Sequence, residues 1–173
     1  MALATLLSGR WLQISGNNAV GGVRIVRLLA WWSFIAVYLQ LVIAAVMRHL
    51  GAGLAIPTFP EAAPDGSWLP AVHNAYVDIN FMHTRVGAVI VTVLLVAAAV
   101  AAFRKTPSLS EIIRPATTVA LLVLVQFALG VFVIWHTKPP TLTSFHVLNG
   151  AALLATTLLL AMRASRADKA IRG

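Results

Sequence analysis

Residues 80–103, "NFMHTRVGAVIVTVLLVAAAVAAF", form a segment long enough and apolar enough to cross a bilayer as a helix. The segment nevertheless carries an imidazole at His83 and a guanidinium at Arg85. An ionisable side chain at membrane depth is costly, and it is tolerated mainly where it faces a partner, a cavity or a cofactor. The segment therefore predicts both a transmembrane helix and a functional site within that helix.

Three further apolar runs have the length of a transmembrane helix, about 20 residues at 1.5 Å each. Of the 173 residues, 60% are hydrophobic and only 10% are charged, which is too little polar surface for a water-soluble domain of this size. Strands are not expected, because open sheet edges cannot be satisfied in lipid. We therefore predict an all-α integral membrane protein, a bundle of four transmembrane helices over residues 28–47, 76–103, 116–135 and 142–162.

The net charge of +8 would suit a nucleic-acid-binding domain, but its distribution indicates membrane topology instead. Only Arg48 and Lys138 flank the side that carries the long first loop, and two acidic residues lie there as well. We predict a multi-pass protein of a prokaryotic cytoplasmic membrane, with both termini cytoplasmic, lipid as a partner and no nucleic acid. Ten cationic residues lie on the side of the termini: Arg10, Arg24, Arg27, Arg104, Lys105, Arg114, Arg163, Arg166, Lys169 and Arg172.

A weak internal repeat relates the first two predicted helices to the last two. "LQLVIAAVMRH" at residues 39–49 and "VQFALGVFVIWH" at residues 125–136 each place a glutamine four positions before a small residue. "HTRVGAVIVTVLL" at residues 83–95 and "HVLNGAALLATTLL" at residues 146–159 each place a histidine four positions before a glycine. The repeat predicts two similar hairpins packed about a pseudo-twofold axis.

The two histidines of this repeat, His83 and His146, are predicted to lie at one depth. Their helices both enter the membrane from the outer side, and each histidine lies roughly 8–10 Å below its entry point. Gly87 and Gly150 follow the histidines by one turn and share their helix faces, which leaves a flat patch beside each imidazole. Two such imidazoles suit the axial ligands of a haem iron, because a porphyrin plane needs room between the helices.

Other readings of the histidine pair remain. The histidines could instead form interhelical hydrogen bonds, with the glycines as close-packing contacts. A zinc or copper ion would need further ligands, and no other histidine or acidic residue is predicted at that depth. The chain has no cysteine, which excludes disulfides and thiolate metal sites. Gln40 and Gln126 are expected to form interhelical hydrogen bonds.

Arg85 and Arg48 are candidates to bind the haem propionates, because arginine is well suited to hold a carboxylate in a dry site. Arg85 lies two residues from His83, so it points from a different face of the helix. Asp78 is a competing partner for Arg85, since the two residues lie on one face two turns apart. Arg48 could equally be a snorkelling residue at a helix end.

Several stretches resemble the haem A synthases, membrane proteins that oxidise the methyl group of haem O to the formyl group of haem A. These stretches are "YLQLVIAAVMRHLGAGLAIPTFP", "NFMHTRVGAVIV", "VQFALGVFVIWHTKPP" and "FHVLNGAALL", and the resemblance covers about residues 26 to 162. Family members typically carry two four-helix halves in one chain, each with a histidine pair. This chain resembles one half.

The resemblance implies that His83 and His146 ligate a haem B iron, with haem O and haem A as substrate and product. It also implies that residues 48–70 cap the pocket. Where the family's catalytic half has a glutamate three residues before the first histidine, this chain has Asn80, which should share a face with His83 and overhang the porphyrin. Asn80 and Asp78 are the candidate catalytic residues. In the family an arginine usually follows the first histidine directly, whereas in this chain Thr84 intervenes and Arg85 lies one position later. The loop cysteines of some members are missing.

Three functions are compatible with these features. The first is haem O oxidation for cytochrome oxidase assembly, which requires a homo-oligomer or a second four-helix half and implies the oxidase or haem O synthase as partners. The second is a bis-histidine b-type cytochrome that carries electrons or serves a respiratory complex. The third is a haem-free scaffold. The expected domains are an interfacial segment and linker (1–25), a four-helix haem-binding domain (26–163, with outer loop 48–75) and a basic cytoplasmic tail (164–173).

Overall fold

The computed structural model describes residues 22–172, which form helices, turns and loops and contain no strand. Most of the expected N-terminal interfacial segment and linker (1–25) lies outside the described residues. The helices α4, η2 and α5 run on from one another, and η2 is a π-helix. The elements are α3 (Val23–His49), η1 (Ala52–Leu54), α4 (Ala75–Phe81), η2 (Met82–Gly87), α5 (Ala88–Lys105), α6 (Ser110–Trp135) and α7 (Pro140–Arg172).

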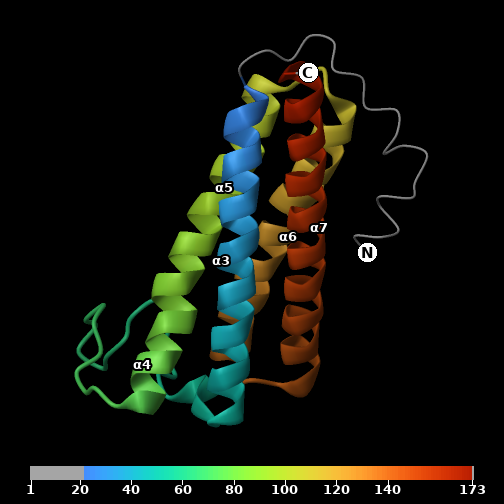
Figure 1. Ribbon diagram of the computed structural model, residues 1–173. Coiled ribbons are helices and arrows are strands. Elements are labelled where there is room, and N and C mark those ends of the chain that lie inside the picture. Colours follow the sequence, from blue (N-terminus) through green and yellow to red (C-terminus); the bar gives the residue numbers. More distant parts are fainter. Residues whose placement is uncertain (1–21, 173) are drawn as a thin grey trace.

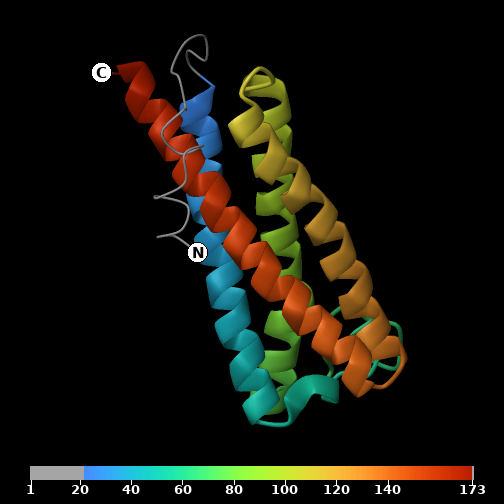
Figure 2. The ribbon, with the colours of Figure 1, turned by 90° about the vertical axis from the view of Figure 1, so that its right-hand side faces the viewer.

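The long helices form a four-helix bundle (Figures 1 and 2). Helix α3 packs against α5 and α7, and α6 packs against the same two helices from the other side. The beginning of α3 and the end of α7 lie at one end of the bundle, opposite the loop between α3 and α4 (Figure 1). The membrane side that this end faces stays a prediction.

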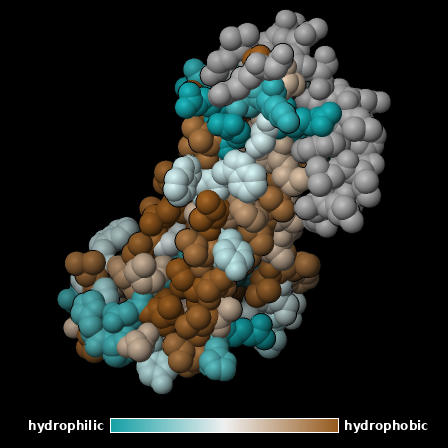
Figure 3. Space-filling model, in the orientation of Figure 1, coloured by the Kyte–Doolittle hydropathy of each residue, from teal (hydrophilic) through white to brown (hydrophobic). Residues whose placement is uncertain are grey.

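The surface of the bundle fits a membrane. Four helices are long and apolar enough to span a bilayer, over Val23–His49, Ala75–Lys105, Ser110–Trp135 and Pro140–Ile171. Apolar side chains cover the middle of the face in Figure 3, whereas hydrophilic ones gather towards the two ends. The chain is therefore an integral membrane protein, and the predicted four transmembrane helices are confirmed. Large apolar side chains exposed on the four helices include Trp32, Leu39, Val89, Val93, Leu121, Leu124 and Leu148.

The end of the bundle that holds the beginning of α3 is closed. Small residues such as Ala30, Ala102 and Ala161 are fully buried there and let the helices approach closely. Arg27 pairs with Asp168 at 2.8 Å. Residues 164–172 continue α7, and Asp168 and the small side chains around it are buried there. The assignment of residues 164–173 to a cytoplasmic tail stays a prediction.

The opposite end is covered by the outer loop, residues 50–74. The chain leaves α3 through Gly51, whose φ of 71° lies in the left-handed region that glycine tolerates. It re-enters the bundle at Asn74, whose side chain accepts hydrogen bonds from the Tyr76 and Val77 backbone N–H groups, each at 3.0 Å. The outer loop therefore spans the end of the bundle between two well-defined helix ends.

Candidate functional site

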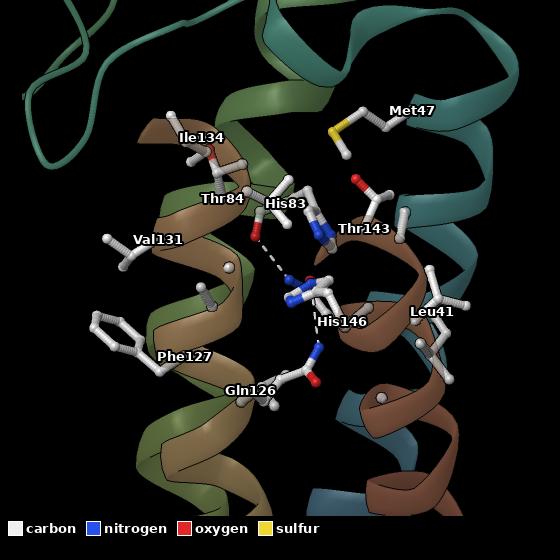
Figure 4. A pocket seen from close by; sticks show the side chains of 18 of the residues that line it. Leu41, Met47, His83, Thr84, Gln126, Phe127, Val131, Ile134, Thr143 and His146 are labelled. Atoms are coloured by element: carbon white, nitrogen blue, oxygen red, sulfur yellow. Dashed lines mark hydrogen bonds between the residues drawn. The ribbon is translucent and has the colours of Figure 1, made fainter. Parts of the chain in front are cut away.

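A cavity of about 200 Å³ lies in the outer half of the bundle, with lining residues from all four long helices. His83 and His146 both line it, and their rings point towards one another (Figure 4). The ring centroids are 6.5 Å apart, and the ring planes are nearly perpendicular, at 84°. The structure thus brings together the two imidazoles that were predicted to lie at one depth.

The backbone at His83 is shaped by the π-helix η2. A π-helical turn is rare, and it occurs frequently at functional sites. Gln40 of α3 donates from Nε2 to the carbonyl oxygen of His83 at 2.7 Å, so the predicted interhelical bond exists. A Cβ added at Gly87 would collide with the Gln40 amide and approach the Met82 carbonyl oxygen to 2.8 Å. Gly87 therefore makes room for Gln40, and it is not among the residues that line the cavity.

His146 lies on α7, which is regular here, and is held through its side chain. Asn149 donates to the Gln126 amide oxygen at 2.8 Å, which leaves the Gln126 amide nitrogen to donate to His146 Nε2 at 3.1 Å. Gly150 lines the cavity, where an added Cβ would lie 3.3 Å from Leu41 Cδ2. Gly150 thus leaves space inside the cavity, unlike Gly87.

Gly130 of α6 is a site residue that the sequence argument did not single out. A Cβ added there would lie 3.2 Å from the Cε1 atom of His146, so the missing side chain leaves room for the imidazole. Its only sequence signal is its position four residues after Gln126.

The histidine pair fits a haem. Nδ1 of each imidazole is buried with no hydrogen-bond partner. Two metal–imidazole bonds of about 2 Å in line would set the ring centroids about 6 Å apart, close to the separation observed. A bare zinc ion needs three or four protein ligands, and residues 22–172 contain no cluster of three His, Asp or Glu that could hold a metal. A porphyrin supplies four ligands itself, so two histidines suffice.

Arg85 is turned towards the outer loop. It donates from Nη2 to the carbonyl oxygens of Thr58 and Glu61, at 2.6 and 2.7 Å, and its guanidinium lies 5.5 Å from the centre of the Phe59 ring. Phe59 lines the cavity, whereas Arg85 does not. The competing pair with Asp78 is not formed, because Asp78 contacts His73 at 2.8 Å. Arg85 therefore holds the loop that covers the cavity.

The candidate catalytic residues Asn80 and Asp78 lie outside the cavity lining. Asn80 is fully buried, and its amide donates to the Ala52 carbonyl oxygen at 2.8 Å. The expected position of this amide above the His83 pocket is not observed, because the amide is turned towards Ala52 of η1. Asp78 is exposed at the surface.

Two cationic side chains line the outer mouth of the cavity, Arg48 and Lys138. Arg48 was a sequence candidate. Lys138 had been assigned only to membrane topology. The Lys138 side chain crosses from the α6–α7 turn towards the residues after α3, since its Nζ lies 3.1 Å from where a Gly53 Cβ would be. The mouth is therefore cationic, although the cavity behind it is mostly apolar.

The family model for cytochrome oxidase assembly proteins, COX15-CtaA, matches residues 1–158. The chain therefore belongs to this family, which is associated with haem and with oxidase assembly. No curated protein and no solved structure matches the chain.

Proposed function

We propose that this protein binds a haem between His83 and His146 and takes part in the conversion of haem O to haem A during cytochrome oxidase assembly. The observation that supports this most strongly is the facing imidazole pair in a membrane-embedded cavity, with each Nδ1 buried and unpaired. Membership of the oxidase assembly family supports the wider role. A bound haem B would supply electron transfer and oxygen chemistry at the site.

The side chains around the cavity prepare the site in three ways. Gln40 and Gln126 orient the two histidines from α3 and α6. Apolar residues such as Val91 and Leu153 exclude water from the deep part of the cavity. Arg85 holds the outer loop, so that Phe59 lies over the outer part of the cavity.

A second candidate function is that of a bis-histidine b-type cytochrome, an electron carrier or accessory subunit. The observation that favours it is the absence of any carboxylate among the described residues that line the cavity. A carboxylate is the usual side chain, besides histidine, for moving protons during oxidation. Oxidation of a separate haem O would in this account require a second four-helix unit, from another copy or another chain, because the described residues provide one facing histidine pair.

A pyridine haemochrome spectrum with mass analysis of the extracted pigment separates these functions. The purified full chain should contain haem B together with haem O, haem A or an alcohol intermediate if it serves haem A formation. Haem B alone would favour the cytochrome. A chain that carries no haem, and takes none up when haem is added, would contradict both functions.

A further inference from the structure

We propose that Lys138, with Arg48, binds a carboxylate of the cavity's ligand and thereby selects an amphipathic macrocycle that carries acidic side chains at its outer edge. This inference rests on the proposed function. It assigns a carboxylate-binding role to the outer mouth of the same cavity. It replaces Arg85, whose terminal nitrogens donate to Thr84 and to the outer loop, as the principal candidate to neutralise a haem propionate.

The first support is the position of the two cations. Both line the cavity, Arg48 from the end of α3 and Lys138 from the turn between α6 and α7. Arg48 lies eight residues, or about 12 Å along the helix, beyond Gln40, which contacts the backbone of His83. The cations therefore lie well outside the imidazole pair, towards the membrane surface.

The second support is that neither cation has an anionic partner within the described residues. The described ion pairs involve Asp168, Asp78 and Glu111 and leave out Arg48 and Lys138. The described chain gives these two side chains no hydrogen bond either, whereas Arg85 has three acceptors. A cation beside an apolar cavity favours an anion from outside the chain, since charges in a poorly hydrated place are stabilised by pairing.

The third support is the backbone that carries Lys138. Thr137 and Lys138 have φ values of 55° and 61°, so two successive non-glycine residues adopt the left-handed conformation. Such residues persist where the surrounding structure holds them, and they gather at ligand sites. Here the Lys138 N–H donates to the Val133 carbonyl oxygen at 2.7 Å. The turn thus directs the lysine across the mouth, in the space that Gly53 leaves free.

The test is a titration of the purified full chain, in a neutral detergent, with haem B and with haem B dimethyl ester, whose carboxylates are blocked. The wild-type chain should bind haem B about tenfold more tightly than the ester, a difference of about 1.4 kcal/mol. Lys138→Gln should remove most of that preference by weakening haem B binding alone. Lys138→Arg should restore it. Lys169→Gln, on the exposed end of α7, is the matched control and should leave both affinities unchanged.

Gly53→Ala is an independent variant, because its methyl group would displace the Lys138 ammonium without removing the charge. It should lower the preference for haem B over the ester to a value between those of the wild type and Lys138→Gln. Equal loss of both affinities in Lys138→Gln, or no loss of either, would overturn the assignment of Lys138 while a bis-imidazole spectrum left the proposed function standing. A preference that is present in neutral detergent but lost in nanodiscs of anionic lipid would assign the cations to lipid phosphate and also overturn it. A wild-type chain that binds neither pigment would contradict the proposed function itself.

Discussion

In the hairpin of α3 and α5, Gln40 donates to a backbone carbonyl, whereas in the hairpin of α6 and α7 the equivalent Gln126 donates to an imidazole nitrogen. The two histidines also differ in their backbones, because His83 lies in the π-helix η2 between α4 and α5, whereas His146 lies in the α-helix α7. In the first hairpin Gly87 provides the space for the glutamine, while in the second Gly150 opens onto the cavity. Equivalent sequence positions thus hold the two histidines by different means.

The comparison extends to the residues on either side of each histidine. Three positions before His83 lies Asn80, buried against the outer loop, while three positions before His146 lies Thr143, which lines the cavity. Two positions after His83 lies Arg85, bound to the outer loop, while two positions after His146 lies Leu148, which is 65% exposed. At these two positions the first hairpin therefore supports the loop, whereas the second faces the cavity and the exposed surface.

The largest expected effect concerns the feature that the two hairpins share, a histidine that lines the cavity. If the proposed haem site is correct, His83→Ala and His146→Ala should each abolish the low-spin bis-imidazole absorption spectrum of the haem-loaded protein, because each would remove one of the two proposed iron ligands. His73→Ala should leave the spectrum unchanged, since His73 is exposed and contacts Asp78. A spectrum that survives one of the first two changes would mean that the hairpins do not contribute ligands equally.

Arg85→Leu places in the first hairpin the residue type that the second hairpin has at the equivalent position, Leu148. Two charge-assisted hydrogen bonds to the outer loop are lost, and we expect a local loss of about 3 kcal/mol. Cleavage of the outer loop by thermolysin should become faster, and the helices should stay protected. Leu148→Ala is the matched control in α7. Unchanged cleavage in Arg85→Leu would show that the loop is held without this side chain.

Replacing each of the two repeat glycines with alanine should change the stability of the protein by different amounts. Gly87→Ala forces a methyl group against Gln40 and the Met82 carbonyl, so we expect a loss of about 2 kcal/mol. Gly150→Ala meets only the ends of flexible side chains, and the better helix propensity of alanine offsets the contact to within about 0.5 kcal/mol. Thermal unfolding in detergent measures both changes. A larger loss in Gly150→Ala would reverse the roles assigned to these glycines.

The smallest effect concerns the two glutamines. Gln40→Leu leaves the His83 carbonyl without its donor, and we expect a loss of about 1 kcal/mol and weaker haem binding. Gln126→Leu removes the hydrogen bond that orients the His146 imidazole itself, so haem binding should weaken more than in Gln40→Leu. Haem titration of both variants checks this. Equal weakening in the two variants would remove the functional difference between the hairpins.

The sequence predicted the features that depend on the length of a helix and on the depth of a residue in the membrane. The four helices follow from apolar runs that match the thickness of a bilayer, and the meeting of His83 with His146 follows from their equal distances to the outer surface. The positions of Gln40 and Gln126 as polar residues within apolar helices also predicted their interhelical hydrogen bonds. These properties are set by one helix at a time and by simple geometry.

Features that depend on tertiary contacts could not be reached in this way. Asn80 is turned towards Ala52 of η1, and Gly87 makes room for Gln40 of α3, so neither role was visible in the sequence. The direction of Arg85 depends on how the outer loop folds back. Lys138 looked like an ordinary flanking cation, because its reach across the cavity depends on two left-handed residues in a turn.

Near-infrared magnetic circular dichroism of the oxidised, haem-loaded wild-type chain, with iron and protein quantified in the same sample, tests the central claim most directly. This spectrum identifies the axial ligand pair of a low-spin haem without any mutation. The account predicts a bis-imidazole signature and one haem iron for each chain that carries the pair His83 and His146. A five-coordinate high-spin iron, or a histidine–methionine signature, would contradict it.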